Sequence, residues 1–380
     1  KILATSLLVE AFLYEEQTRR GVSLAHWAEF DDVAAHCTVC HRCEKPCPVD
    51  IDFGDVTIAM RNLLRKQGKQ KFNLGTTAAM TFLTIKDPMF IKGIREVMIR
   101  FGYAAQNKLY KLGKSLHLIQ DQVAHPPATV HKPPVRTQII NFINKPMPGN
   151  LPKRSARALL DIEDDKVIPV IRNPKLSAEE SEAVFYFPGC GSERLFSQVG
   201  LATQAMLYEV GATTVLPPGY LCCGYPQTSG GQEDKGQRIT TDNRVLFHRV
   251  ANTLNYLDIK TVIVSCGTCM DQLQKYQFER IFPGCRLLDI HEYLMEKGVK
   301  LDGVEGTRYM YHDPCHSPMK TYAPLKVTSE LMGTAVPLND RCCGESGTLA
   351  VTRPDISTQV RFRKQEEMEQ GANELRADGF

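Results

Sequence analysis

Residues 187–190 are Phe-Pro-Gly-Cys, residues 221–224 are Leu-Cys-Cys-Gly, and residues 265–269 are Ser-Cys-Gly-Thr-Cys. Neighbouring cysteines rarely bond to each other, because the peptide between them opposes the disulfide dihedral angle. Two adjacent thiolates can instead bind different irons of one cluster. We therefore predict that the five cysteines of these motifs meet in space and hold an iron–sulfur cluster; they are Cys190, Cys222, Cys223, Cys266 and Cys269.

Each of the three motifs follows an apolar segment that is typical of a buried β-strand. The predicted strands are 183–187, 213–216 and 260–265, and the predicted helices between them are 201–210 and 235–257. Alternating strands and helices indicate a parallel α/β sheet, in which the loops after the carboxyl ends of the strands share one edge. The topology should therefore bring the five thiols together.

Residues 308–380 repeat this pattern. The segment from Tyr309 to Cys315 matches the segment that ends at Cys190, and Arg341-Cys342-Cys343-Gly344 matches residues 221–224. In the first copy the Cys-x-x-Cys pair begins 44 residues after Cys222, and the same interval from Cys342 reaches past Phe380. We therefore expect a longer polypeptide, with Cys315, Cys342 and Cys343 as cluster ligands of the second copy. Gly224 and Gly344 are expected to adopt positive φ or to allow a close backbone approach.

A different motif occupies residues 37–48, Cys-Thr-Val-Cys-His-Arg-Cys-Glu-Lys-Pro-Cys-Pro. Its C-x2-C-x2-C-x3-C-P spacing is that of bacterial ferredoxins. Three thiolates in one tight turn can bind three irons of a cubane, whereas the fourth, before a proline, points out of the turn. We predict a 4Fe–4S cubane on Cys37, Cys40, Cys43 and Cys47. Either all four bind it, or Cys47 serves a second cluster whose partner motif lies upstream of Lys1. Zinc is the alternative, although zinc knuckles usually come as two well-separated Cys-x2-Cys pairs.

Composition narrows the class of protein. The chain has 380 residues, 43% of them hydrophobic and 23% charged, and its net charge of +3 predicts no attraction to nucleic acid. Most of the 13 cysteines have the spacing of metal ligands and no signal peptide is apparent, so we predict a reducing cytoplasm rather than disulfides. Cys285 stands apart and is expected to be a small buried hydrophobe.

The segment between the ferredoxin motif and the α/β region is basic and helical in pattern. Residues 61–114 hold twelve Lys or Arg and two acids, and the uncharged run 72–85 is too short to span a bilayer. Two interpretations stay open: a solvated face over buried helices, or a peripheral contact with an anionic membrane surface. Residues 125–153 are proline-rich and predict an extended connector, with some packing at 139–143.

The paired cysteine motifs resemble the CCG domain of the heterodisulfide reductases. This domain also occurs in the iron–sulfur subunits of glycolate oxidase, of lactate utilisation and of anaerobic glycerol-3-phosphate dehydrogenase. The helix-then-motif layout is similar to the helical ferredoxin domains of succinate dehydrogenase and of the heterodisulfide reductases. The resemblance covers residues 30–60 and 183–380. It implies a non-cubane 4Fe–4S cluster on the five cysteines of the first copy.

The basic segment and the connector look like the carboxyl-terminal part of fused FAD-linked oxidases. This resemblance implies an iron–sulfur module of a dehydrogenase for a small D-2-hydroxy acid of the lactate, glycolate or 2-hydroxyglutarate class. The FAD would lie on an upstream domain or partner protein, because no G-x-G-x-x-G occurs here. Electrons would leave to a quinone or a soluble carrier. The alternatives are a catalytic CCG site that reduces a disulfide, and a zinc-bound structural or assembly module.

These inferences predict an α + α/β protein in which a helical ferredoxin-like domain precedes two repeated α/β CCG units. The expected boundaries are 1–120 for the ferredoxin-like domain with its basic extension, 121–182 for the connector, 183–300 for the first unit and 301–380 for the second, truncated unit. The expected location is the cytoplasm, with a peripheral contact of residues 61–114 on the inner face of the membrane as the open alternative. No catalytic residue is assigned.

Overall fold

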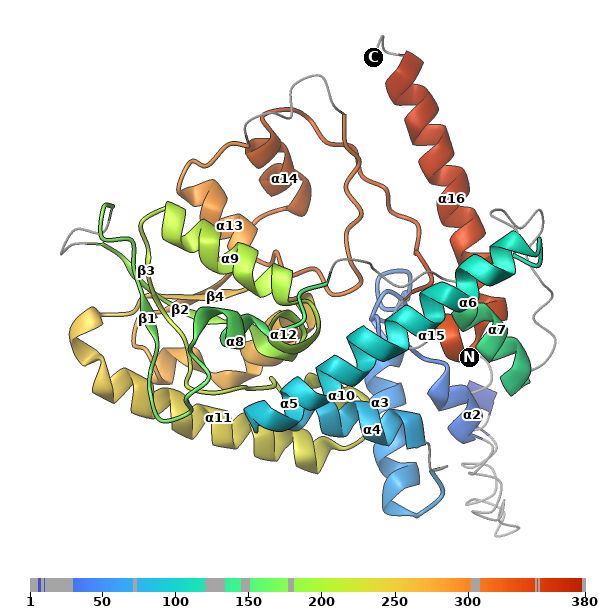
Figure 1. The fold of residues 1–380 in the computed structure, drawn as a ribbon, viewed down its shortest axis with the longest axis horizontal. Helices are drawn as coiled ribbons and strands as arrows, with labels where there is room; N and C mark the ends of the chain where they lie inside the picture. Colours follow the sequence, from blue (N-terminus) through green and yellow to red (C-terminus); the bar gives the residue numbers. More distant parts are fainter. Residues whose placement is uncertain are drawn as a thin grey trace.

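The computed structural model describes residues 30–70, 74–119, 134–144, 151–176, 181–301, 308–345, 347 and 349–377, together with 6, 7 and 10. Most of the first 29 residues of the predicted ferredoxin-like domain therefore lie outside the described residues, and α2 (Phe30–Ala35) precedes the ferredoxin motif. A mixed helical and α/β architecture is confirmed: helices fill the amino-terminal part, and a sheet covered by helices follows (Figure 1).

The sheet has five strands in the order β1-β3-β2-β4-β5. Their bounds are β1 Val170–Ile171, β2 Ala183–Phe187, β3 Thr213–Val215, β4 Thr261–Val264 and β5 Arg286–Asp289. The last four are mutually parallel, and β1 adds an antiparallel edge. The three predicted strands are confirmed to within one residue at each end, whereas β1 and β5 were not predicted.

Helices cover both faces of the sheet. One face carries α9 (Ser197–Glu209), α13 (Ile290–Glu296) and α14 (Pro324–Met332), and the other carries α11 (Glu233–Thr253) and α12 (Gly267–Leu273). Alternate residues of β2 enter the two cores, Tyr186 on the first face and Phe185 on the second. The strand is buried throughout because a parallel sheet with helices on both sides leaves neither face in water.

The second cysteine copy has less regular structure than the first. Tyr311 pairs with Leu338 in an isolated parallel bridge, and the helices are α14, α15 (Leu349–Thr352) and the long α16 (Pro354–Ala377). Its apolar segment is short and ends in His-Asp-Pro, where proline offers no N–H to a ladder. In the described residues this copy therefore has no sheet of its own. Helix α14 packs instead against the first copy's sheet.

The helical pattern predicted for the basic segment between the ferredoxin motif and the α/β region is confirmed. They are α3 (Phe53–Lys66), α4 (Leu74–Thr84), α5 (Pro88–Arg95), the π-helical η2 (Glu96–Tyr103) and α6 (Ala104–Ser115). Asp87 caps α5 by accepting from Met89 and Phe90, and Pro88 suits the first turn because that N–H needs no partner. Helices α5, η2 and α6 follow one another as one long rod (Figure 1).

Part of the predicted connector is folded. It contains α7 (Val135–Ile143), α8 (Ala156–Leu160) and the edge strand β1. Of these, α7 contacts α6. Of the packing expected at 139–143, the structure shows a contact at Ile143, whose carbonyl accepts from Gln106, whereas Ile139 and Ile140 are exposed. Residues 120–133 and 145–150 lie outside the described part. Short helical turns complete the chain: η3 Gly191–Leu195, α10 Tyr225–Ser229, η4 Asn255–Leu257, η5 Gln274–Tyr276 and η6 Phe278–Arg280. No helix among the described residues has the length and apolar character needed to cross a bilayer.

Candidate metal centre

Strand topology places three cysteine groups at one edge of the sheet. Strands β3, β2 and β4 are parallel neighbours, so their carboxyl ends point the same way. Cys190 follows β2, Cys222 follows β3, and Cys266 follows β4 within two residues. The predicted convergence of these loops is therefore observed: Cys190, Cys222 and Cys266 follow strands whose carboxyl ends share one edge of the sheet.

The five thiols of the first copy form a chain of hydrogen-bonding contacts. Its order is Cys190, Cys222, Cys223, Cys269 and Cys266. The first four are buried and Cys266 is half-buried. The structure thus assembles the predicted set, and its role as a ligand set stays a prediction. We call this set the five-thiol site.

Mutual hydrogen bonding separates the acidities of these thiols. The pKa of Cys222 falls well below its ordinary value because Cys190 and Cys223 donate hydrogen bonds to its sulfur. The pKa values of Cys190 and Cys223 rise, first because of the same contacts with Cys222 and then through burial. A hydrogen bond from Cys269 lowers the pKa of Cys266 to about 6. Thiolates therefore form readily at two points of the site, and thiolates are the form that binds metal.

Two glycines make room for the site. Gly189 has φ of +70°, and a β-carbon there would lie 2.7 Å from the Cys269 sulfur. Gly224 has φ of +90°, and a β-carbon there would lie 3.0 Å from the Gly236 carbonyl oxygen. The prediction for Gly224 is confirmed, as is that for Gly344, which has φ of +75°. Only glycine fits at Gly189 without displacing a sulfur.

Two buried side chains beside the five-thiol site hold N–H groups without a partner in the described structure. The guanidinium of Arg194 donates through Nη1 to the carbonyls of Phe82 (3.3 Å) and Leu83, but its Nε and Nη2 have no partner. Gln227 lies with Oε1 3.9 Å from the Cys222 sulfur, and its Nε2 has no partner. Buried N–H groups are nearly always paired, so these donors fit an acceptor such as the sulfides of a cluster.

Arg194 also brings positive charge to the site. Its side chain is fully buried, and its charge acts on Cys190 and Cys222. Burial lowers the pKa of Arg194, and the negative charge of a Cys190 thiolate opposes that shift. A buried cation beside five cysteines suits a group that carries net negative charge. Donor set, cradle and charge therefore all fit an iron–sulfur cluster.

The ferredoxin motif forms a tight turn after α2. Val39 and His41, both non-glycine, have φ of +52° and +57°, which is the left-handed region that such residues rarely adopt. Backbone N–H groups donate to sulfur at 3.4 Å, from Val39 to Cys37 and from Ile51 to Cys47. The turn is strained and directs N–H groups at its thiols, as a cluster-binding turn requires.

One cysteine of this turn contacts the second copy. The Cys40 thiol lies within hydrogen-bonding contact of Cys315, which also contacts Cys342. The hydrogen bond from Cys315 lowers the pKa of Cys40 to about 5. Arg42 fixes this junction, because it donates at 2.9 Å to the carbonyls of both Asp313 and Asp340. Cys343 is half-buried next to Cys342.

His316 lies where the three cysteine regions meet. Its Nδ1 is 2.5 Å from the Asp271 carboxylate, and its Nε2 is 3.1 Å from the Tyr225 hydroxyl. Its ring stands edge-on to that of His41, with centroids 5.6 Å apart. These contacts pack the Cys315 loop against both the ferredoxin turn and the five-thiol site. His312 is less central, since it contacts the Asn339 carbonyl and Lys364.

Sequence reasoning missed the polar residues that hold the sites. Arg42 lies inside the ferredoxin motif, and Tyr225 directly follows Cys-Cys-Gly, so position relative to the cysteines was the available indication. Arg194 follows Cys190 by four residues, in the π-helical turn η3. A charged residue so close to a predicted buried ligand could have been tested as a partner of the cluster.

Comparison with known proteins agrees with this site. Residues 184–274 and 309–376 match the cysteine-rich domain family, CCG. An uncharacterized iron-sulfur protein of Methanococcus maripaludis is 22% identical over 341 residues, covering 88% of this chain and 53% of the relative. One component of the fumarate reductase (CoM/CoB) of Methanothermobacter marburgensis is 28% identical over 189 residues, covering 48% and 36%. Lactate utilization protein A of an Exiguobacterium species is 24% identical over 210 residues, covering 50% and 83%.

The chain spans about half, or less, of the length of the first two relatives. No solved structure matches it. The five-thiol site is formed within the first matched segment, and Cys315, Cys342 and Cys343 lie within the second. The two segments that match the cysteine-rich domain family, CCG, are thus the segments that carry these cysteines.

Proposed function

We propose that this protein is the iron–sulfur electron-transfer module of a flavin-linked dehydrogenase. The substrate would be a small D-2-hydroxy acid, the FAD would sit on another domain or partner protein, and electrons would leave to a quinone or a soluble carrier. The observation that carries the proposal is the five-thiol site, in which loops after three parallel strands bring five sulfurs into contact. A 4Fe–4S cluster bound there supplies one-electron redox chemistry.

The chain's own residues support such a group at this site. The five thiols would hold it, with Cys222 and Cys266 the most readily deprotonated. Arg194 and Gln227 would donate hydrogen bonds to its sulfides, since their N–H groups have no other partner in the described structure. Burial of four of the thiols excludes water, which protects the cluster and favours electron exchange over side reactions.

Sulfur spacing favours a cluster over a single zinc ion. Thiolates around tetrahedral zinc lie about 2.3 Å from the metal, so their sulfurs lie about 3.8 Å from one another. In the part of the chain that the structure describes, the only trio of potential ligand atoms within 4.8 Å of one another is His41, Asp52 and Asp55. No three cysteine sulfurs there are packed as a zinc site needs. The chain-like arrangement suits several irons held at separate corners.

The relatives support the substrate class. One is named lactate utilization protein A, and another is a component of a fumarate reductase, so both names concern small carboxylic acids. Lactate is a 2-hydroxy acid, and this agrees with the proposed dehydrogenase. A membrane-borne quinone would also agree with the basic helical segment as a peripheral membrane contact.

Metal analysis tests the proposal. The full chain, purified without oxygen, should contain iron and acid-labile sulfide and should give a paramagnetic signal on reduction. Cys222→Ser should lose the iron of the five-thiol site. Cys285→Ser is the matched control, because Cys285 lies at the amino end of β5, away from the edge that carries the other thiols. Zinc without labile sulfide, or equal iron in both variants, would sink the proposal.

A further inference from the structure

The orientation of the α5–η2–α6 rod is fixed by buried contacts along its inner side. Ile91, Arg95 and Gln106 are buried. Arg95 donates to the carbonyls of Arg154 and Leu195 at 3.2 Å, and also to those of Pro152 and Arg194. Gln106 donates to the Ile143 carbonyl of α7 at 3.0 Å. The opposite side of the rod is therefore held in solvent.

Large apolar side chains line that outer side. Their exposed fractions are Met89 82%, Phe90 66%, Val97 62%, Phe101 62%, Leu109 48%, Leu112 56% and Leu116 58%. The steps between successive turns are three or four residues, and Gly93 and Ala105, both exposed, fill the remaining turns. Steps of four match the wider π-helical turns of η2, and together with the shorter steps in α5 and α6 they keep these side chains on one side of the rod. We call this line the outer stripe; it extends about 40 Å, taking 1.5 Å per residue.

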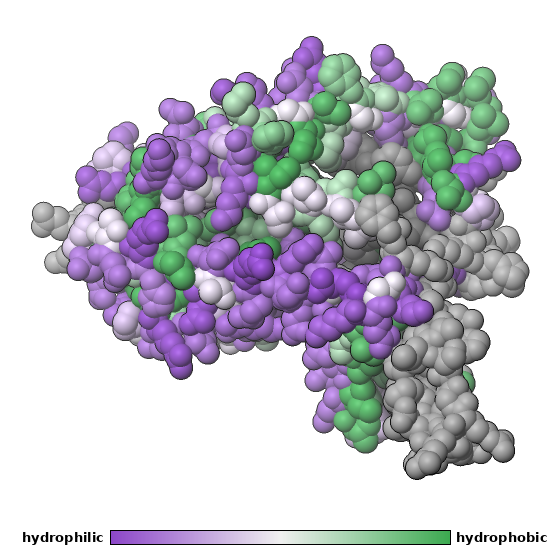
Figure 2. All heavy atoms as spheres, turned by 90° about the horizontal axis from the view of Figure 1, so that it is seen from below, coloured by the Kyte–Doolittle hydropathy of each residue, from purple (hydrophilic) through white to green (hydrophobic). Residues whose placement is uncertain are grey.

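The outer stripe is a large apolar surface for a soluble chain. Hydrophobic side chains gather along this edge in the view of Figure 2, and α7 adds Val135, Ile139 and Ile140, which are 68%, 53% and 45% exposed. Scattered apolar residues on a surface are ordinary, but contiguous rows of this length usually mark a place of contact. Something is expected to cover the stripe.

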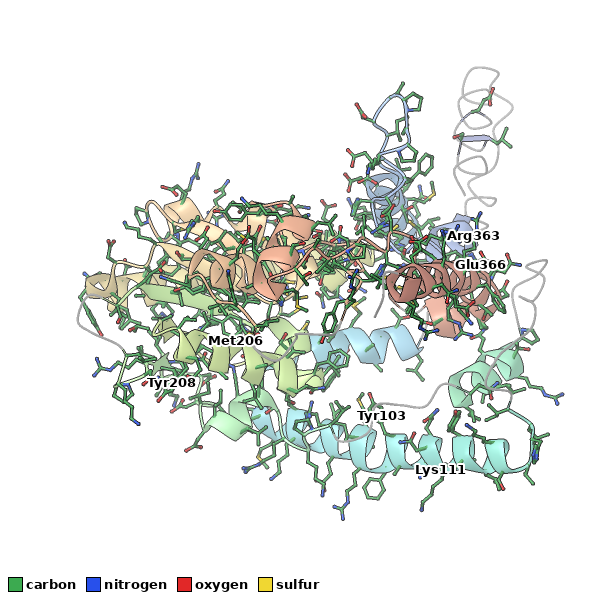
Figure 3. The ribbon with its side chains drawn as sticks, turned by 90° about the horizontal axis from the view of Figure 1, so that it is seen from above. Tyr103, Lys111, Met206, Tyr208, Arg363 and Glu366 are labelled. Atoms are coloured by element: carbon green, nitrogen blue, oxygen red, sulfur yellow. The ribbon has the colours of Figure 1, made fainter. Side chains whose placement is uncertain are left out.

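Cations flank the stripe. The exposed ones between residues 86 and 114 are Lys86, Lys92, Arg100, Lys108, Lys111 and Lys114. Lys111 lies on the side of the rod that faces away from the body (Figure 3). The two acids are already engaged: Asp87 caps α5, and Glu96 accepts from Arg100 at 2.8 Å. The net field along the outer side is therefore positive.

Two arginines of the basic segment 61–114 face the rest of the chain and are not available to an outside partner. Arg61 donates to the carbonyls of Cys37 (2.6 Å) and Ser229 (2.5 Å), so it holds the ferredoxin turn rather than facing a partner. Arg65 donates to the Gly231 carbonyl at 2.8 Å and pairs with Asp234. These two arginines therefore face the rest of the chain, and the cations that flank the outer stripe begin at Lys86.

We propose that the outer stripe lies on the surface of an anionic lipid bilayer, with its apolar side chains between the headgroups and its lysines against lipid phosphates. An amphipathic rod with apolar residues on one line and cations beside it has the character of an interfacial helix. The competing occupant is a flavin-bearing protein. To match the lysines beside the stripe, its surface would have to be negatively charged over about 40 Å. The proposal rests on the stripe alone. Together with the proposed function, it would identify the side of the protein that meets a membrane-borne quinone.

Vesicle flotation with the full chain tests this. Vesicles of phosphatidylcholine that contain about 30% phosphatidylglycerol should bind at least tenfold more protein than vesicles of pure phosphatidylcholine. Added salt should weaken this binding. Phe101→Ser with Leu112→Ser should reduce binding at least tenfold, and Lys108→Glu with Lys111→Glu should remove the preference for anionic lipid. Val245→Ser with Tyr256→Ser is the matched control, since these side chains are 60% and 74% exposed elsewhere.

Circular dichroism and iron content should be equal in all variants, which separates lipid binding from folding and from the cluster. Absence of binding to anionic vesicles would overturn the proposal, as would equal binding of the stripe and control variants. Loss of a flavin-bearing partner in the stripe variants, with no lipid binding by the unaltered chain, would assign the surface to protein contact instead. Loss of iron in Cys222→Ser would leave the lipid result unchanged.

Discussion

The backbone carbonyl of His316 lies directly against Gly267, so that a β-carbon at Gly267 would overlap its oxygen. Gly267 is part of the Cys-x-x-Cys pair of the five-thiol site, and His316 follows Cys315 of the second copy. The loops of the two cysteine copies are therefore packed backbone to backbone. Only a residue without a side chain allows this approach.

Gly267→Ala should disturb both cysteine regions. The new methyl group would meet main chain rather than a movable side chain, so we expect destabilisation of about 1–3 kcal/mol and lower iron content. Chemical denaturation and iron analysis measure the two effects. Gly93→Ala is the control, because a β-carbon at Gly93 would point into open space beside its helix. Equal behaviour of the two variants would contradict the close packing.

Arg194→Gln should make a cluster bound at the five-thiol site harder to reduce. Loss of a buried positive charge disfavours an added electron, and we expect a potential more negative by on the order of 60 mV, the one-electron equivalent of a tenfold change. Redox titration followed by electron paramagnetic resonance gives the value. Arg194→Lys should retain much of the potential, and Arg238→Gln, an exposed position on α11, should have none of the effect. An unchanged potential in Arg194→Gln would remove the proposed role of this charge.

Arg42→Lys should loosen the junction between the ferredoxin turn and the second copy. A lysine keeps the charge but cannot span the carbonyls of Asp313 and Asp340 as a guanidinium does. We expect a loss of about 1 kcal/mol and faster amide exchange around both aspartates. Exchange mass spectrometry with Arg280→Lys as the control measures this, and identical exchange in the two variants would count against the junction.

Glu182 should make stability depend on pH. Burial alone would raise its pKa, but hydrogen bonds from Lys297 (2.7 Å) and Thr261 (2.6 Å) outweigh burial and hold the pKa below its ordinary value of 4.5. The stabilisation is therefore complete above pH 4.5 and is lost as the pH falls through the depressed folded value.

Glu182→Gln should lower the free energy of unfolding by about 0.5–1 kcal/mol at pH 7 and by less in acid. Denaturant titrations across this range measure the difference, with Glu209→Gln on the exposed side of α9 as the control. A difference that persists unchanged in acid would mean that the carboxylate is not the source of the effect.

The core of the fold could be predicted because it rests on local patterns and one topological rule. The run Ala183 to Phe187 is apolar throughout, which predicts a strand with both faces covered. Once strands and helices alternate, the loops after the strands must share an edge. Convergence of Cys190, Cys222 and Cys266 followed from these two facts without any knowledge of side-chain contacts.

The remaining features depend on contacts that no local pattern specifies. Cys40 and Cys315 are 275 positions apart, and only the docking of the ferredoxin turn brings them together. Arg95 and Lys111 are both cations on one rod, yet the first is buried and the second exposed. Sequence periodicity identified the helices but not which of their sides the rest of the chain would cover.

Helix α14 has a consequence for the history of this molecule. It belongs to the second cysteine copy, yet Val327 and Leu331 complete the core above the sheet of the first. Because the second copy contributes this helix to the core of the first, the two copies are not independent folding units. Loss of the second copy would expose the apolar face of the sheet that Val327 and Leu331 cover, so we expect the two copies to be inherited together.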